Sequence, residues 1–326
     1  MLMSDVDASP GEPTAHTHEG AIDADAFERL RTVRAAAPAT IGDALAARTR
    51  RDISRGDGRM FIVAADHPAR GALGVRRSEM AMADRYDLLA RLATALSRPG
   101  VDGVLGTPDI LEDLAVLGLL DDKITVGSMN RGGLRGASFE MDDRYTGYTI
   151  EGIVNSRHDF AKLLVRINLS DAGTARTLET TAQVITDAAA ARVPIMIEPF
   201  MSQWAHGKIV NDLSANAVIT SVAIAAGLGA TSAYSWLKLP VVPDMERVMA
   251  ATTLPTLLLG GDPGGHPDDT YTSWENALAL PGVHGLVVGR TLLYPHDGDV
   301  AAAVDIAAGL VHSAVPSAVS SAVHTA

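Results

Sequence analysis

Short apolar runs alternate with longer amphipathic segments over most of this 326-residue sequence. Each run has the length of one strand and ends in polar residues or glycine, as strands buried in a parallel sheet do. The segments between the runs, such as Glu79–Leu96 and Thr174–Ala191, have helical character. The eight predicted strands are Met60–Ala65, Gly103–Gly106, Ile124–Gly127, Leu163–Leu169, Pro194–Glu198, Ala233–Leu239, Thr256–Leu259 and Gly285–Val288.

This alternation of strand and helix predicts parallel βαβ units, and eight units are the number that closes a barrel. An open doubly wound sheet usually has fewer strands and carries a glycine fingerprint after the first one. Here Asp66-His67-Pro68 follows the first strand. Gly227-Leu228-Gly229 lacks the third glycine and is expected to end a helix. The predicted fold is therefore a (β/α)8 TIM barrel.

The segments outside the strands suggest three parts. Residues 1–24 contain no Lys or Arg and are rich in Asp, Glu, Pro, Ser, Thr and Gly, which predicts a flexible N-terminal lead. Two helical patterns, Ala26–Ala36 and Ile41–Arg50, form an N-terminal helical extension of the barrel, and about Asp299–Val311 is its last helix. The barrel with these helices occupies residues 25–312, and residues 313–326 form a C-terminal tail.

Composition narrows the function. The chain has no cysteine, which excludes disulfides, thiolate nucleophiles and Cys-ligated metals. Its net charge of −12 argues against nucleic acid, whose phosphates need a basic face, but is compatible with a small anionic substrate. No apolar run reaches the length of a membrane span, and no secretory signal precedes the barrel, so we expect a cytoplasmic protein.

The lysine count directs attention to single residues. The chain has four lysines, Lys123, Lys162, Lys208 and Lys238, against 23 arginines. The active sites of (β/α)8 enzymes lie at the C-terminal ends of the strands. The residues predicted at those ends are Asp66, Thr107, Asn130, Arg166 with Asn168, Glu198, Lys238, Asp262 and Arg290.

Lys238 is the strongest candidate for catalysis because apolar residues flank it on the sixth predicted strand. Burial would lower the pKa of its ammonium group from about 10.4 and expose a nucleophilic amine. The alternative is a strand-end lysine that pairs with a carboxylate. Glu198 ends the fifth strand and is a candidate for proton transfer, or for a salt bridge. Asp66 is a candidate second acid/base, or a group that orients Lys238 or a substrate hydroxyl.

Glycines after the seventh and eighth strands indicate a phosphate site. Gly260 and Gly261 follow the seventh strand, and Gly289 with Arg290 follows the eighth. Loops at these two positions often bind phosphate through backbone N–H groups, which glycine allows to come close to the anion. Arg290, together with Arg70 and Arg166, would add charged donors.

These residues resemble the class I, Schiff-base aldolases that act on deoxyribose phosphate, fructose bisphosphate and tagatose bisphosphate, over about residues 58–312. Ala65-Asp66-His67-Pro68-Ala69-Arg70-Gly71 resembles the Asp-His-Gly or Asp-Gln-Arg-Gly segment of their first strand. Ile197-Glu198-Pro199 is similar to the Glu-Pro of the tagatose enzymes, where Glu transfers protons. Trp236-Leu237-Lys238 takes the place of their Schiff-base lysine. Leu259-Gly260-Gly261 and Val288-Gly289-Arg290 resemble their phosphate-binding strand ends.

The whole chain resembles more closely an actinobacterial family of aldolase-like (β/α)8 proteins associated with inositol breakdown genes. Two departures from the aldolases stand out. Leu239-Pro240 follows Lys238 where the aldolases have Thr, Val or Tyr, which affects the shape of the pocket. Arg166 takes the place of a lysine of the tagatose enzymes and keeps the charge.

The resemblance implies a cofactor-independent aldolase in which Lys238 forms an iminium, Glu198 moves protons and Asp66 assists. It also implies a phosphorylated keto sugar or sugar acid as substrate, with 5-dehydro-2-deoxy-6-phosphogluconate as the first guess, and a homo-oligomer. A metal-dependent aldolase or isomerase is the alternative enzyme, since His67, His206, His266 and His284 are available. Their spacing does not form a metal-ligand pair, so no metal site is predicted. A barrel that binds a phosphometabolite without catalysis is the non-enzymatic alternative.

Overall fold

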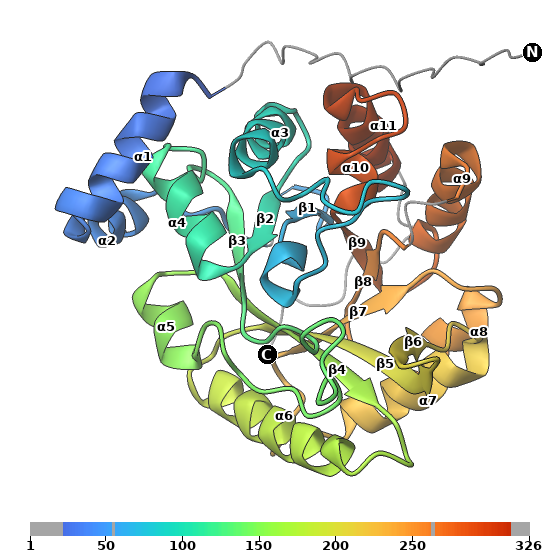
Figure 1. Cartoon of the computed structure of the whole chain (residues 1–326). Coiled ribbons are helices and arrows are strands. Elements are labelled where there is room, and N and C mark those ends of the chain that lie inside the picture. The colour runs from blue at the N-terminus through green and yellow to red at the C-terminus, as the bar shows by residue number, and fades with distance from the viewer. Residues whose placement is uncertain (1–21, 54–55, 262–264, 314–326) are drawn as a thin grey trace, which may run out of the picture.

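A closed barrel of eight parallel strands, surrounded by helices, forms the centre of the molecule (Figure 1). The computed structural model describes residues 22–53, 56–261 and 265–313. Strands pair with their sequence neighbours around the barrel, and the pairing of β4 with β5 closes it, which confirms the predicted (β/α)8 fold. The barrel strands are β1 (Met60–Ala64), β2 (Gly103–Gly106), β3 (Ile124–Ser128), β4 (Phe160–Ile167), β5 (Ile195–Ala205), β7 (Ser235–Pro240), β8 (Thr256–Leu259) and β9 (Val283–Val288).

Helices follow the strands and cover the outside of the barrel. Two of them, α1 and α2, precede β1 and form the predicted extension, and α2 packs on α4. In Figure 1 they lie to one side of the barrel. The helices are α1 (Ala24–Ala36), α2 (Ala39–Ala47), η1 (His67–Arg70), α3 (Arg85–Ser97), α4 (Pro108–Val116), α5 (Ile150–Asn155), α6 (Gly173–Ala190), α7 (Ala215–Ala226), α8 (Met245–Met249), α9 (Pro267–Leu278), α10 (Arg290–Leu293) and α11 (Val300–Ser313).

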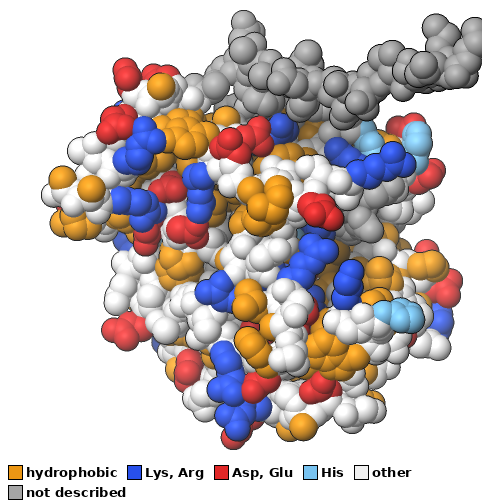
Figure 2. Space-filling view, in the orientation of Figure 1, with side chains coloured by type: hydrophobic (Ala, Val, Ile, Leu, Met, Phe, Trp, Pro, Cys, Tyr) orange, Lys and Arg blue, Asp and Glu red, His pale blue; other side chains and the backbone are white. Residues whose placement is uncertain are grey.

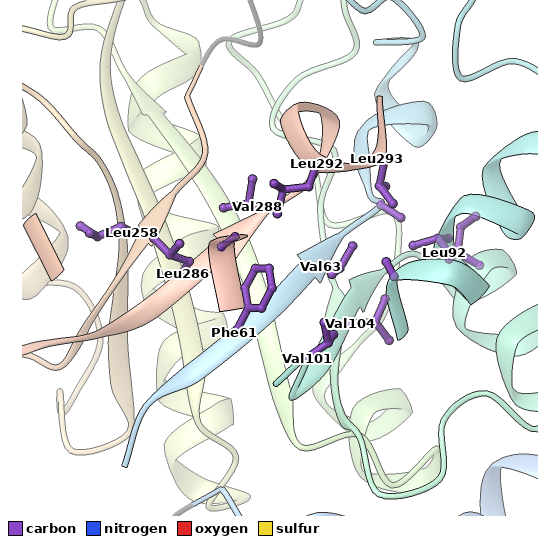
Figure 3. Packing of buried hydrophobic residues seen from close by; sticks show 14 of the residues in the cluster. Phe61, Val63, Leu92, Val101, Val104, Leu258, Leu286, Val288, Leu292 and Leu293 are labelled. Atoms are coloured by element: carbon purple, nitrogen blue, oxygen red, sulfur yellow. The ribbon is translucent and has the colours of Figure 1, made fainter. Parts of the chain in front are cut away.

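Two sets of buried side chains hold the barrel together. Strand residues alternate between the barrel interior and the layer under the helices, because successive side chains point to opposite faces. Phe61, Val63 and Val104 lie in the outer layer with Leu92 of α3 and Leu292 of α10 (Figure 3). The inner set fills the barrel and consists of Met60, Ile62, Ala64, Leu105, Ile124, Val126, Phe160, Met196, Leu257 and Val287.

One element was not predicted. Strand β5 continues beyond Glu198 to Ala205, and β6 (Lys208–Asn211) turns back along it as an antiparallel hairpin. His206 and Gly207 at the turn have φ values of 50° and 73°. Positive φ at both central residues is the geometry of a tight hairpin turn that matches the twist of the strands. The hairpin therefore lengthens one side of the barrel beyond the end of the other strands.

Several predicted boundaries differ from the structure. Strand β4 begins at Phe160 rather than Leu163, so Lys162 lies inside it. Helix α3 begins at Arg85 rather than Glu79, because the Asp84 side chain accepts hydrogen bonds from the backbone of Tyr86 and Asp87 and caps the helix there. Most of the predicted N-terminal lead, the tail beyond Ser313, and Asp262 lie outside the described residues. None of the described helices is long and apolar enough to cross a membrane.

Candidate active site

A layer of charged side chains lies directly above the apolar filling of the barrel. Lys162, Glu198 and Lys238 come two residues after Phe160, Met196 and Trp236 on β4, β5 and β7. Residues two apart on a strand share a face, so all three point into the barrel toward its C-terminal end. Asp66 stands in the same relation to Ala64, just past the end of β1.

These four side chains form one connected ion-pair network. Lys162 Nζ lies 2.9 Å from Asp66 Oδ2 and 2.8 Å from Glu198 Oε2. Lys238 Nζ lies 3.0 Å from the same Oε2 of Glu198. The four side chains are between 4% and 11% exposed. The structure thus brings together the predicted residues Asp66, Glu198 and Lys238, and it adds Lys162 between them.

The two lysines of the network differ in how well their positive charge is stabilised. Burial lowers the pKa of Lys162, but the charges of Asp66 and Glu198 on either side outweigh burial and hold its pKa above the ordinary value. Burial also lowers the pKa of Lys238, and there the charges of Glu198 and the more distant Asp66 do not compensate, with Lys162 adding repulsion. Lys238 is therefore the amine that can lose its proton, and Lys162 the permanent cation.

Both carboxylates of the network are held in the ionised form. Burial by itself would raise the pKa of Glu198, but the charges of Lys162 and Lys238 lower it to about 2. Burial would also raise the pKa of Asp66, but the charge of Lys162 opposes it, and the pKa of Asp66 lies far below its usual range. Glu198 can therefore accept a proton when its lysine partners move or react.

The arginines predicted at the site lie above this network. Arg166 is 8% exposed, and its Nη1 donates to Glu140 Oε1 at 2.8 Å and also contacts the Gly132 carbonyl oxygen. Burial, and then the charge of Arg70, lowers the pKa of Arg166, so the two arginines are electrostatic neighbours. It is Lys162, four residues earlier on β4, that contacts Glu198.

The predicted phosphate loops bring backbone segments close together. A Cβ on Gly260 would come within 2.4 Å of Val288 Cγ1, and one on Gly289 within 2.3 Å of the Ala64 carbonyl oxygen. Gly261 has a φ of 70°, which favours glycine. Arg290 Nη1 lies 3.4 Å from the Gly74 carbonyl oxygen. The face of the molecule seen in Figure 2 carries Lys and Arg side chains near its middle, although the chain as a whole is acidic.

Other predicted strand-end residues make local contacts instead. Thr107 donates to Asp109 at the start of α4. The Asn130 side chain forms two hydrogen bonds with the backbone of Leu164 on β4: its Oδ1 accepts from the amide, and its Nδ2 donates to the carbonyl oxygen. Asn168 holds the turn before α6. Among the described residues, no three His, Cys, Asp or Glu side chains converge on a position that could hold a metal ion.

Lys162 is the site residue that the sequence analysis missed. The predicted fourth strand began one residue after it, so it was not placed at a strand end. Two signals were present: Lys162 is one of four lysines, and its spacing of two residues from Phe160 and Leu164 places it on the same face of β4. Extending the strand back to Phe160 would have placed Lys162 beside Glu198.

Solved structures with this fold include Schiff-base aldolases. An archaeal fructose 1,6-bisphosphate aldolase is 19% identical, covers 84% of this chain and 99% of its own, and superimposes with a TM-score of 0.57. A Schiff-base-forming fructose-1,6-bisphosphate aldolase is 21% identical over 83% of this chain and 99% of its own, also with a TM-score of 0.57. At these identities the likeness shows a shared fold. No curated protein matches the sequence.

A much nearer relative has also been crystallised. Cgl0159 from Corynebacterium glutamicum is 68% identical, with 90% of this chain and 98% of that one covered and a TM-score of 0.88. Residues 58–308, which include the whole barrel and every residue of the charged network, match the Cgl0159-like family. The chain therefore belongs to the Cgl0159-like family.

Proposed function

We propose that the protein is a cofactor-independent class I aldolase that cleaves a phosphorylated keto sugar or sugar acid through a Schiff base at Lys238. The observation that carries the proposal is the pair of buried lysines on one oxygen of Glu198. One lysine is held charged by two carboxylates, and the pKa of the other is lowered. A buried amine with a lowered pKa beside a proton-transfer group is the requirement for imine chemistry at neutral pH.

In the proposed mechanism each group of the network has a role. The neutral amine of Lys238 attacks the substrate carbonyl carbon, and the carbonyl oxygen takes two protons and leaves as water, which gives an iminium. The electron pair of the cleaved carbon–carbon bond then flows to the iminium nitrogen, leaving an enamine and an aldehyde. Glu198 accepts and returns protons at Lys238 and at the enamine carbon, while Lys162 and Asp66 keep Glu198 in position.

We further propose that the substrate phosphate binds at Gly260, Gly261, Gly289 and Arg290, with Arg70 and Arg166 adding positive charge at the rim. The close approach of the β8 and β9 ends supports this site. The specific substrate that we propose is 5-dehydro-2-deoxy-6-phosphogluconate, cleaved to dihydroxyacetone phosphate and malonate semialdehyde. It rests on the resemblance to aldolase-like proteins linked to inositol breakdown. We also expect a cytoplasmic protein that forms a homo-oligomer, and light scattering of the purified protein tests its oligomeric state.

Borohydride trapping tests the Schiff base. Reducing the enzyme with dihydroxyacetone phosphate should add a stable mass to the peptide that contains Lys238. The Lys238→Met variant should lose both trapping and turnover, because removing the nucleophile of a covalent route costs many orders of magnitude in rate. Lys208→Met, which removes an exposed lysine of β6, is the matched control and should behave as wild type. A Lys238→Met enzyme with full turnover refutes the mechanism.

Arg290→Ala tests the phosphate site. Hydrogen bonds to a charged group contribute roughly 1.5–3 kcal/mol, so kcat/KM should fall by about ten- to a hundredfold or somewhat more. Trapping at Lys238 should persist in this variant at high substrate concentration. Arg247→Ala, which removes an exposed arginine of α8, is the control. An unchanged kcat/KM, or an unphosphorylated substrate that serves equally well, rules out the phosphate site but leaves the lysine chemistry intact.

Chelation separates the two rival functions. A class I aldolase should keep its activity after exhaustive treatment with EDTA, because the iminium replaces the metal ion as electron sink. If chelation abolishes activity and Zn²⁺ restores it, the enzyme is metal-dependent instead. A protein that binds dihydroxyacetone phosphate without trapping or turnover is a barrel without catalysis.

A further inference from the structure

His67 occupies a position next to the charged network. It is the first residue of η1 and directly follows Asp66. Its backbone carbonyl accepts from the Ala72 amide, which fixes the short turn. The imidazole Nδ1 lies 3.6 Å from Asp66 Oδ1, which is longer than a hydrogen bond. Within the described part of the chain this nitrogen is buried and has no hydrogen-bond partner.

The network and His67 form one row of acidic and basic groups. From Lys238 the row passes to Glu198 at 3.0 Å, to Lys162 at 2.8 Å and to Asp66 at 2.9 Å. Asp66 uses Oδ2 for Lys162 and turns Oδ1 toward His67. A contraction of a few tenths of an ångström would let Nδ1–H donate to Oδ1. Asp66 would then fix one tautomer of His67 and leave Nε2 as an acceptor, as a carboxylate does for a catalytic histidine.

His67 is the neutral member of this row. Burial lowers the pKa of His67 to about 3; the charge of Asp66 opposes this shift, and the positive charges of Arg290, Arg70 and Lys238 add to it. A neutral imidazole has one N–H donor and one acceptor lone pair. Glu198 and Asp66 are by contrast tied to ammonium groups, which makes them weak bases toward a substrate hydroxyl. The side chain of His67 is 19% exposed, so a ligand in the barrel mouth can reach it.

We propose that His67 is a further catalytic residue, which accepts the proton of the substrate hydroxyl group during carbon–carbon cleavage. This role rests on the proposed function. In the iminium intermediate, His67 takes the proton from the hydroxyl next to the breaking bond. The oxygen then forms the carbonyl of the departing aldehyde, and the bond's electron pair moves to the iminium nitrogen. The resulting imidazolium returns its proton through Asp66 or water before the next cycle.

Binding of a phosphorylated substrate would prepare His67 for this step. Arg290 and Arg70 both repel a proton on the imidazole, and Arg290 belongs to the proposed phosphate site. A phosphate dianion there would offset their charge, so the basicity of His67 would rise when substrate is bound. A general base works best when its pKa approaches the working pH. The coupling would keep His67 neutral in the empty site and strengthen it in the loaded one.

The test separates imine formation from bond cleavage in His67→Gln and His67→Gly. Borohydride trapping of dihydroxyacetone phosphate at Lys238 should remain close to wild type in both variants. Cleavage of fructose 1,6-bisphosphate and of 5-dehydro-2-deoxy-6-phosphogluconate should fall by about a hundredfold or more in kcat, the usual contribution of a general base. Added imidazole should restore part of the cleavage rate in His67→Gly. His284→Gln, at the opposite end of the barrel, is the matched control.

Three results would overturn the proposal. Unchanged cleavage in His67→Gln shows that the imidazole is not the base. Equal loss of trapping and cleavage, without rescue by imidazole, shows that His67 only shapes the site. A wild-type enzyme that neither forms the imine nor cleaves either sugar refutes the proposed function itself, and the role of His67 with it.

Discussion

The lysine network at the C-terminal end of the barrel differs in its cations from the arginine ion pairs at the N-terminal end. At the N-terminal end, Asp159 pairs with Arg48 and Arg50 and accepts from the Thr125 backbone at 2.8 Å. Asp102, just before β2, pairs with Arg51 and accepts from the Phe61 backbone at 2.7 Å. At the C-terminal end the cations of the network are Lys162 and Lys238, which share one carboxylate oxygen.

This difference separates a structural role from a chemical one. Arginine keeps its charge under all ordinary conditions, and backbone N–H groups hold the carboxylates in the fold. The N-terminal pairs therefore fasten the residues before β1 to the bottom of the barrel. Lysine changes its protonation state when it is buried, and the shared oxygen leaves one lysine short of negative charge. Buried ion pairs with arginine thus stabilise the N-terminal end of the barrel, whereas those with lysine give the C-terminal end a group that can react.

Removing Lys162 should produce the largest change in this comparison. Lys162→Met removes the charge that repels a proton on Lys238 and gives Glu198 to Lys238 alone, so the pKa of Lys238 should rise. Less neutral amine is then present at pH 7, and kcat/KM should fall about ten- to a hundredfold, with its acid limb moved to higher pH. Lys162→Arg keeps the charge and is the control. A pH–rate profile with an unmoved acid limb would contradict the assignment of the two lysines.

Removing Asp102 should affect stability instead of catalysis. Asp102→Asn removes a buried carboxylate charge from Arg51 and from Nε2 of His312, which keeps its pair with Asp57. Breaking a buried pair in this way costs about 3–5 kcal/mol in the free energy of unfolding, which urea denaturation measures. The kcat of the folded enzyme should be unchanged. A variant with normal stability and reduced kcat would show that the N-terminal end also takes part in the chemistry.

His312 should give the smallest effect and a distinct pH dependence. Its Nε2 contacts Asp102, its Nδ1 donates to Asp57 at 2.9 Å, and these partners raise the pKa of His312 to about 9. Because the unfolded value is about 6.5, the charged histidine stabilises the fold fully below pH 6.5, and this contribution disappears as the pH rises toward 9. His312→Gln should lose about 1–2 kcal/mol at pH 6 and nothing at pH 10 in urea denaturation.

If the stability difference between His312→Gln and wild type grows as the pH rises, His312 is not protonated in the folded state. Its charge then does not contribute to holding α11 against the barrel.

Local patterning was enough to predict the barrel and three members of the network. Lys238 stands out in sequence because apolar neighbours surround it, and Glu198 and Asp66 end apolar runs. Lys162 was overlooked because Asp159 and Lys162 itself interrupt the apolar run that marks β4. The sharing of Glu198 Oε2 by two lysines depends on the register of β4, β5 and β7, which involves residues far apart in the chain. No single segment contains that information.

The apolar filling of the barrel forms the floor of the site. Below the network, Phe160, Met196 and Trp236 belong to or pack against the apolar filling. These packed hydrocarbon side chains exclude water. They also screen charges much more weakly than water does, so the charged groups of the network act strongly on one another. A substrate bound at the barrel mouth would lie on the side of the network that this filling does not cover. The charge of that substrate would therefore also influence the protonation of Lys162 and Lys238.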